Sequence, residues 1–327
     1  MASNAALHRE FLERWRSQEL HFPMQSSGST GPPSRLMWER KHMIWSAERT
    51  REAWFHCCQD LSQLCVLPLD KAGGLMQAVR AEVWGSPIAI REASAVPNLE
   101  GQFSLVSLTP MQLHGVLQGD YGAHTLAQFH TVLLGGGPLD PALEQRLLEP
   151  DLLGVRFIHT FGMSETYSHF AGRVIAKTQE PYRVIPGYQW KIASDGELQV
   201  LSPCTQEQWL ETRDLVQAQG PGFRWIGRRD FVVNSGAVKI HIEETESMIA
   251  KHLGWSTQAF FLWKEADPML GERLVLVFSQ HAPENRDIDW SFLPAYHKPK
   301  QWYLCETPLT QNGKWMRAAS FEVAVPL

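Results

Sequence analysis

The chain has few cysteines, no long apolar run and no excess of basic side chains. Its five cysteines among 327 residues include the adjacent pair Cys57 and Cys58, a usage that does not indicate a disulfide framework. No apolar stretch approaches the roughly 18 residues that cross a bilayer, and residues 1–16 lack a signal-peptide core. These absences predict a cytoplasmic protein with no membrane partner.

The charge balance is mildly acidic, with 30 Lys and Arg against 35 Asp and Glu and a formal net charge of −5. This balance argues against a nucleic-acid partner. The basic and aromatic residues Arg224, Trp225, Arg228 and Arg229 belong to no wider basic segment, so we interpret them as part of a hinge. Any anionic ligand must therefore be bound by a local site.

Short apolar runs alternate with amphipathic segments over the first half of the chain. Strands are expected near residues 64–69, 88–90, 103–108, 131–134 and 155–158, and helices near 75–84, 111–117 and 141–148. Such alternation is typical of a parallel sheet covered by helices on both faces. The sequence thus predicts an α/β fold with parallel or mixed sheets.

The pattern changes after about Pro181, where a β-hairpin turning at Asp195 and Gly196 indicates a β-rich subdomain. Beyond Gly227 a new pattern begins, with a helix near residues 243–252, strands near 259–263 and 274–278, and a polar tail. We therefore predict a large domain of residues 1–229 and a small α+β C-terminal domain of residues 230–327.

The segment from Ser26 to Arg35 reads SSGSTGPPSR. Glycines beside hydroxyl side chains let the backbone approach an anion while N–H and O–H groups donate to it. The segment is not a Walker loop, because it has no Gly-Lys-Ser/Thr ending. By itself the same composition is also that of a flexible linker.

Four later segments follow this loop in a fixed order. They are Thr160–Thr166 (TFGMSET), Thr212-Arg213-Asp214, Gly227–Asp230 leading into Asn234–Lys239, and Thr310–Arg317 (TQNGKWMR). Together with the loop, the series resembles the ordered motifs of the acyl-adenylate-forming superfamily, which includes acyl- and aryl-CoA ligases. The resemblance extends from Ser26 to Arg317, over nearly the whole chain.

Within that superfamily the chain is most similar to the compact o-succinylbenzoate–CoA ligases of menaquinone synthesis. The segments that carry this closer likeness are residues 42–47, 67–69, 73–76, 79–81, 109–113, 135–138 and 296–300. The resemblance implies that a carboxylate attacks the α-phosphate of ATP, pyrophosphate leaves, and the thiol of CoA then displaces AMP. The implied ligands are ATP, Mg²⁺, CoA and a small carboxylic acid, with an o-succinylbenzoate-like aryl acid as the leading substrate.

The first step of that reaction joins groups that repel each other, so it requires cations and hydrogen-bond donors where charge develops. The resemblance implies a nucleotide site in which each motif has a role. The β- and γ-phosphates are assigned to the loop residues Ser27, Gly28, Ser29, Thr30 and Gly31. Mg²⁺ is assigned to Glu165, and the α-phosphate to Thr166. The ribose is assigned to Asp214 and Arg228, and the adenine to Gly135, Gly136, Gly137 and Phe161.

The resemblance also makes Lys314 the adenylation catalyst, because a point charge near the chain end can bridge the acyl carboxylate and the α-phosphate. In the family the small C-terminal domain rotates after adenylation. Asp230 matches the hinge of that rotation, and Gly236 and Lys239 match the face that then lines the thiol channel.

Lys71, Gly74 and Arg80 match the acyl pocket. Arg80 either pairs with a second carboxylate of a dicarboxylic substrate or is an ordinary solvated arginine on a helix.

The chain departs from the family pattern at several positions. Ser34 stands where the first loop carries lysine, with Arg35 next to it, and Asp70-Lys71 replaces the pair that lines the acyl pocket. Phe161 replaces tyrosine, Ser164 replaces threonine, and Arg213 replaces the glycine of the Thr-Gly-Asp motif. The chain begins shortly before the loop, so we expect most of the usual N-terminal subdomain to be absent.

Each assigned residue has an ordinary alternative when it is considered alone. Glu165 can be a helix N-terminal acid, Asp214 a turn residue and Lys314 a surface lysine. Two further functions stay open: a non-catalytic nucleotide-binding relative, and an adenylating enzyme that loads a carrier-protein thiol. The oligomeric state stays open between monomer and homodimer. The joint presence of Lys314, Glu165 and Asp214 favours an enzyme.

Overall fold

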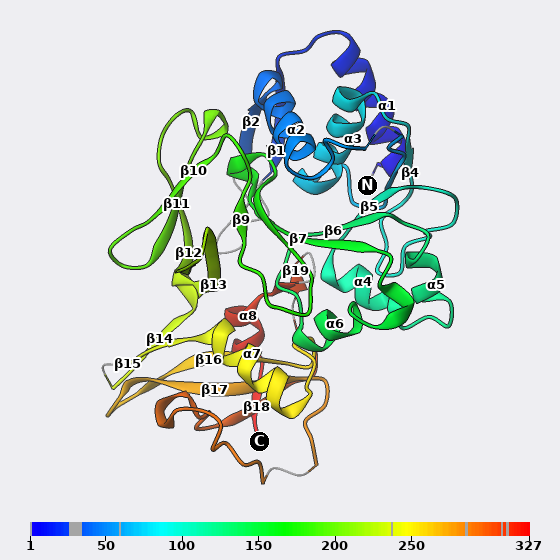
Figure 1. The fold of residues 1–327 in the computed structure, drawn as a ribbon. Helices are drawn as coiled ribbons and strands as arrows, with labels where there is room; N and C mark the ends of the chain where they lie inside the picture. The colour runs from blue at the N-terminus through cyan, green and yellow to red at the C-terminus, as the bar shows by residue number, and fades with distance from the viewer. Residues whose placement is uncertain are drawn as a thin grey trace.

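The computed structural model describes residues 2–25, 35–58, 60–236, 238–284, 287–308, 310–311 and 314–327. Figure 1 shows a central sheet with helices on its two faces, a smaller sheet beside it, and a C-terminal sheet at the opposite end from the N-terminal helices. No helix in these ranges has the length and apolarity needed to span a bilayer.

The central sheet has seven strands in the order β4-β3-β5-β6-β7-β8-β9. They are β3 (Gln63–Cys65), β4 (Ile88–Ile90), β5 (Leu105–Leu108), β6 (Thr131–Leu134), β7 (Arg156–Gly162), β8 (His169–Val174) and β9 (Arg183–Val184). Pairing is parallel from β4 to β7 and antiparallel for β8 and β9. Every residue of β3, β5 and β6 is buried, as expected for a sheet covered on both faces.

Helices cover the two faces of this sheet. They are α1 (Asn4–Arg16), α2 (Arg40–Trp54), α3 (Ala72–Trp84), α4 (Pro110–Leu117), α5 (Gly122–Leu126) and α6 (Pro141–Arg146). The strands alternate between two cores: Val106 and Val132 pack with residues of α4 to α6, while Leu105 and Leu133 pack with Phe55 and Trp84. The predicted α/β class is therefore confirmed.

The residues 26–34 lie between two paired strands. β1 (His21–Gln25) and β2 (Arg35–Glu39) form an antiparallel hairpin in which Gln25 faces Arg35. The predicted phosphate-loop residues Ser27, Gly28, Ser29, Thr30 and Gly31, together with Ser34, lie outside the described residues. Their assignment stays a prediction.

A four-stranded antiparallel meander lies beside the central sheet. Its strands are β10 (Gln189–Ile192), β11 (Glu197–Leu201), β12 (Leu210–Gln219) and β13 (Gly222–Arg228). The hairpin predicted around Asp195 and Gly196 is confirmed, since β10 pairs with β11 across it. The meander packs through Phe223 and Val216 against Phe170 of β8.

Residues after Asp230 build a six-stranded sheet with its own core. Its elements are β14 (Val232–Ser235), β15 (Val238–His241), α7 (Ile242–Leu253), β16 (Phe260–Asp267), β17 (Gly271–Ser279), β18 (Trp302–Cys305) and β21 (Val325–Pro326). Between β18 and β21 the chain forms β19 (Thr310–Gln311), β20 (Lys314–Trp315) and α8 (Arg317–Glu322), which lie outside this sheet. The expectation of a polar tail is wrong, because Trp302 and Leu304 pack β18 onto this core.

In the described part of the chain, five short 3₁₀ turns join these elements. They are η1 (Pro150–Leu152), η2 (Ser164–Thr166), η3 (Pro203–Thr205), η4 (Arg229–Phe231) and η5 (Ala295–His297). Two of them carry residues of the predicted site, since η2 follows β7 and η4 joins the meander to the six-stranded sheet. The site is therefore built where the sheets end.

Candidate active site

The predicted adenine-binding residues lie at the carboxyl ends of two neighbouring parallel strands. Gly135, Gly136 and Gly137 follow β6, and Phe161 lies near the end of β7. This edge of an open α/β sheet is where such folds bind ligands. A Cβ at Gly135 would lie 2.7 Å from Thr160 Oγ1, and Gly136 has a φ of +88°. The loop therefore requires glycine at two of its three positions.

Phe161 takes part in a cluster of aromatic rings. Its ring meets Phe170, Tyr182 and Phe223 edge-to-face at centroid distances of 5.6, 5.2 and 5.4 Å. Such contacts hold an aromatic side chain in a defined orientation. The half-buried Phe161 ring is thus fixed next to the glycine loop, although its contact with adenine stays a prediction.

A buried polar chain below the glycine loop was missed by sequence reasoning. The Tyr182 hydroxyl oxygen lies 2.8 Å from His159 Nδ1, and His159 Nε2 lies 3.0 Å from the Gly137 carbonyl oxygen. Burial and the Arg173 cation lower the pKa of His159 to about 4, so the ring is neutral, with Nε2–H donating to Gly137 and Nδ1 accepting from Tyr182. The only sequence signal was a histidine two residues before Phe161.

The acidic motif after β7 forms the short turn η2. Thr166 is fully buried, and its hydroxyl lies 2.6 Å from the Ser168 carbonyl and 3.0 Å from the Met163 carbonyl. Its contact with the α-phosphate stays a prediction. To donate to a phosphate oxygen, the Thr166 hydroxyl must give up its hydrogen bond to a backbone carbonyl. Ser164, which sequence reasoning left without a role, is half-buried and uses its carbonyl to accept from Trp38 Nε1 at 3.1 Å.

Glu165 lies in the same turn and is half-buried. Among the described residues no cluster of three or more His, Cys, Asp or Glu side chains could hold a metal ion. A single carboxylate fits Mg²⁺, which keeps several waters and takes its other ligands from phosphates. The donor set is thus compatible with the predicted ion.

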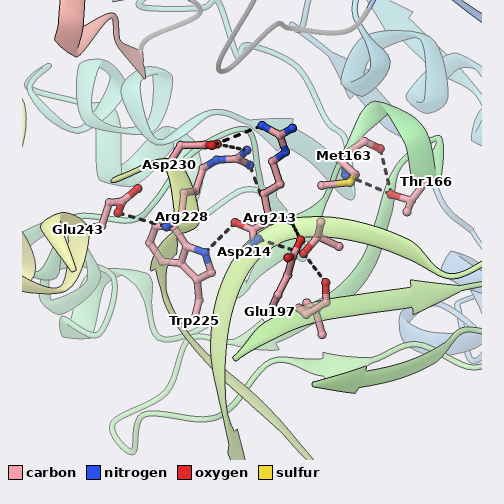
Figure 2. Close-up of polar contacts among 11 residues, drawn as sticks. Met163, Thr166, Glu197, Arg213, Asp214, Trp225, Arg228, Asp230 and Glu243 are labelled. Carbon is pink, nitrogen blue, oxygen red and sulfur yellow. Dashed lines mark hydrogen bonds and ion pairs between the residues drawn. The ribbon is translucent and has the colours of Figure 1, made fainter. Parts of the chain in front are cut away.

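Asp214 and Arg228 lie opposite each other in the β12–β13 pair, although 13 residues separate them in sequence. Figure 2 shows the two side chains together with Trp225 and Asp230. Trp225 Nε1 donates to Asp214 Oδ1 at 2.9 Å, and Arg228 Nη1 lies 3.9 Å from Asp214 Oδ2. The fold therefore brings together the two residues assigned to the ribose.

Asp230 lies in η4, between the last strand of the meander and the first strand of the C-terminal sheet. Its carboxylate faces two arginines, with Oδ2 3.1 Å from Arg228 Nη2 and Oδ1 3.4 Å from Arg213 Nη1. Arg213 has a φ of 61°, a left-handed backbone that explains why the family has glycine there. The chain's arginine thus adds an ion pair to the predicted hinge (Figure 2).

The buried carboxylate of Glu197 joins the same cluster. Its Oε1 accepts from the Arg213 backbone N–H at 2.7 Å, and its Oε2 lies 2.8 Å from Arg229 Nη1. Because Arg229 belongs to η4, this carboxylate ties the meander to the junction itself.

The side chain of Glu243, on α7, contacts the end of β13. Its Oε2 accepts from the Arg228 backbone N–H at 3.2 Å, and a Cβ at Gly227 would lie 2.6 Å from the same oxygen. Burial raises the pKa of Glu243 to about 8, against the opposing effect of the Arg317 cation. The motif glycine Gly227 therefore makes room for a carboxyl group that is protonated at neutral pH.

The residues assigned to the C-terminal half lie on different elements. Lys314 begins β20, and Arg317, three residues later, forms a buried ion pair with Glu246 of α7. Gly236 has a φ of +57° in the β14–β15 turn, and Lys239 is exposed on β15. The roles of Lys314, Gly236 and Lys239 stay predictions.

The three residues assigned to the acyl pocket differ in their surroundings. Lys71 is half-buried, 3.5 Å from the Asp70 carboxylate, and a Cβ at Gly74 would lie 2.2 Å from the Pro68 carbonyl oxygen. Gly74 therefore permits the close approach of α3 to the segment before it. Arg80 is 3% exposed, so the interpretation as a solvated arginine is wrong. Most residues of α3 are buried, because α2 and β3 pack against this helix.

Arg80 is a buried cation with few partners. Its Nη1 donates to Ser168 Oγ at 3.2 Å, its Nε has no hydrogen bond, and no carboxylate among the described residues forms an ion pair with it. Burial lowers the pKa of Arg80 to about 10. Burial and then the Arg80 cation lower the pKa of the neighbouring His169 well below its usual value. The surroundings of Arg80 are therefore suited to an anion.

Comparison with known proteins agrees with this geometry. The model of the family described as AMP-binding enzyme matches residues 6–206. The chain is 24% identical over 343 residues to a 2-succinylbenzoate–CoA ligase of Listeria monocytogenes, covering 94% of this chain and 70% of the relative. It is 23% identical over 304 residues to a 3,4-dihydroxybenzoate–[aryl-carrier protein] ligase of Bacillus anthracis, covering 89% and 71%.

Solved structures of other proteins share the fold. An acyl-CoA synthetase (AMP-forming)/AMP-acid ligase II-like protein of Dyadobacter fermentans is 30% identical with a TM-score of 0.65, covering 98% of this chain and 94% of that one. The o-succinylbenzoate CoA synthetase of Bacillus subtilis in complex with its acyl-adenylate intermediate is 19% identical with a TM-score of 0.77, covering 90% and 68%. The chain belongs to the AMP-binding enzyme family.

Proposed function

We propose that this chain is an AMP-forming carboxylate–CoA ligase whose acyl substrate is an o-succinylbenzoate-like aryl dicarboxylic acid. The observation that carries the substrate class is Arg80, a buried cation at the acyl-pocket position with an unpaired Nε. A buried charge without a partner is costly, and a substrate carboxylate offsets that cost. The relative from Listeria, named for 2-succinylbenzoate, supports the same class.

The nucleotide occupies the edge formed by β6, β7 and the meander. Gly135, Gly136, Gly137 and Phe161 wall the adenine, and Asp214 accepts from the ribose hydroxyls while Arg228 donates beside it. Ser27, Gly28, Ser29, Thr30 and Gly31 hold the β- and γ-phosphates. Glu165 holds Mg²⁺, and Thr166 donates to the α-phosphate.

Two successive steps share this site. The substrate carboxylate oxygen forms a bond to the α-phosphorus of ATP as the bond to pyrophosphate breaks, and Lys314 stabilises the negative charge of that transition state. The thiolate of CoA then attacks the acyl carbon, and AMP leaves. Residues 230–327 form a mobile domain that turns about Asp230 between the steps, bringing Gly236 and Lys239 to the thiol channel.

The acyl acceptor distinguishes the leading function from an alternative. One relative is named for an aryl-carrier protein, so a carrier-protein thiol is the second candidate acceptor. The first half-reaction is the same for both, and only the second differs. A non-catalytic nucleotide-binding relative is the third candidate.

The test is exchange of labelled pyrophosphate into ATP with a panel containing o-succinylbenzoate, benzoate, 3,4-dihydroxybenzoate and an aliphatic acid. We expect exchange with o-succinylbenzoate well above that with benzoate, and thioester formation when CoA is added. Exchange without a CoA thioester indicates the carrier-protein acceptor. Silence with every acid, in protein that is folded by circular dichroism, refutes the ligase.

A further inference from the structure

Asp140 joins the large α/β part of the chain to the C-terminal part. The residue caps α6, where its Oδ1 accepts from the Ala142 N–H at 2.8 Å. Its Oδ2 accepts from both the backbone N–H and the hydroxyl of Thr257, at 2.7 and 3.0 Å. These partners are 117 residues apart in sequence, and Thr257 lies in the turn between α7 and β16.

Thr257 in turn holds the residue next to Lys314. The indole Nε1 of Trp315 donates to the Thr257 carbonyl at 3.1 Å, and the indole packs on the buried Phe261 ring at 5.4 Å. Lys314 and Trp315 together form strand β20. A chain of hydrogen bonds therefore runs from Asp140 through Thr257 to the strand that carries Lys314.

The Asp140 carboxylate is held in a defined place. Glu144, on the next turn of α6, forms a two-pronged ion pair with Arg173 of β8 at 2.7 and 2.6 Å, and both side chains are largely buried. Because this pair fastens α6 to the central sheet, Asp140 cannot follow a movement of the C-terminal part.

Contacts close to a pivot and contacts far from it respond differently to rotation. Arg228 N–H to Glu243 and Arg224 to Glu244 lie beside Asp230 along the chain, at 3.2 and 2.9 Å. Asp140 lies in the part of the chain before that junction and Thr257 in the part after it. A rotation of the C-terminal part about Asp230 moves Thr257 relative to Asp140, so their hydrogen bonds favour the orientation in this structure over a rotated one.

We propose that the orientation in this structure is the one in which Lys314 serves adenylation, and that Asp140 is a positioning residue that stabilises it. The inference rests on the proposed function, since it takes Lys314 as the residue that acts in the first half-reaction. Two hydrogen bonds to a carboxylate favour the adenylation orientation by about tenfold or more over the thiol orientation. Loss of Asp140 therefore affects one half-reaction and not the other.

The first test compares Asp140→Asn with Thr257→Val. Asn keeps one oxygen for the helix cap but cannot accept both sets of bonds, whereas Val removes only the Thr257 hydroxyl. We expect pyrophosphate exchange to fall about tenfold in Asp140→Asn and about threefold in Thr257→Val, with thiolysis of a supplied acyl-adenylate unchanged in both. Equal loss in both half-reactions, or no loss in either, overturns the proposal.

The second test traps the contact. Asp140→Cys and Thr257→Cys are combined in a chain whose exposed Cys57 and Cys58 are replaced by serine. The oxidised protein should keep pyrophosphate exchange and lose thiolysis at least tenfold, with recovery on reduction. Loss of exchange with retained thiolysis overturns the proposal.

The two tests separate this proposal from the function on which it rests. If the wild-type protein shows no pyrophosphate exchange with any acid, the ligase function is refuted and the Asp140–Thr257 contact is not. The crosslinking yield, read by gel mobility, reports the orientation without any chemistry. A low yield then overturns the Asp140–Thr257 contact.

Discussion

The guanidinium of Arg213 reaches the carboxylate of Asp230, the predicted hinge residue, with Nη1 3.4 Å from Oδ1, from a backbone that has a φ of 61°. A left-handed backbone costs a non-glycine residue about 1–2 kcal/mol. The Arg213 side chain is 60% exposed, and an ion pair at such a site contributes about 0–1 kcal/mol. The backbone strain therefore outweighs the ion pair.

Arg213→Gly should consequently be at least as stable as the wild type, and about 1 kcal/mol more stable than Arg213→Ala. Alanine removes the ion pair and keeps the strained φ, so it is the matched control. Both variants keep the backbone N–H that donates a hydrogen bond to the Glu197 carboxylate. The measurement is the free energy of unfolding from denaturant titration, and an Arg213→Gly variant less stable than Arg213→Ala contradicts the strain argument.

Lys314→Ala should abolish acid-dependent pyrophosphate exchange, with a loss of at least about 100-fold, because it removes the cation at the developing charge. Thiolysis of a supplied acyl-adenylate should stay largely intact, since the proposed rotation removes the lysine from the site before that step. Lys239→Ala, on the face assigned to the thiol channel, is the opposite control and should slow only thiolysis. Equal losses in both half-reactions would remove the assignment of Lys314.

Arg80→Gln should raise the KM for o-succinylbenzoate by at least about tenfold, because the buried cation no longer meets the second carboxylate. The KM for benzoate, which has one carboxylate, should change little. Arg80→Lys keeps the charge and should give an intermediate KM. A parallel rise for both acids in steady-state kinetics would show that Arg80 supports the fold and not the substrate.

Glu243 should make stability depend on pH. Its carboxyl group has a pKa of about 8 in the folded protein against an ordinary value of 4.5, so the folded state binds the extra proton between those values. Stability must therefore fall as the pH rises from about 4.5 to 8. Glu243→Gln keeps an acceptor for Arg228 N–H and should flatten this slope. Denaturant midpoints at four pH values measure it, and an unchanged slope argues against the buried proton.

The fold could be predicted largely from local patterns. The apolar runs at β4 and β6 gave their exact bounds, because short strands between helices leave a short continuous apolar signature, whether fully buried as β6 is or partly buried as β4 is. The end of the chain could not be predicted in this way. β18 is a short strand whose apolar residues matter only because β17 and β21 lie beside it.

Part of the candidate site could likewise be predicted from the sequence, and part of it could not. The motifs indicated that Asp214 and Arg228 act together, and the β12–β13 register places them opposite each other. Sequence reasoning did not find His159, whose role depends on Tyr182 and the Gly137 carbonyl reaching it from other strands. It also considered a solvated arginine and a substrate contact for Arg80 and did not foresee its burial, because burial is set by neighbouring elements.

By itself, the sequence determined the α/β class, the order of the motifs and the family to which they belong, since these follow from residue types and spacings along the chain. Only the tertiary structure decided that Arg80 is a buried cation, that Arg213 reaches Asp230, and that Asp140 holds Thr257 beside the Lys314 strand. These relationships join residues far apart in sequence. Hydrogen bonds and burial depend on distances in space, which no local pattern of residues specifies.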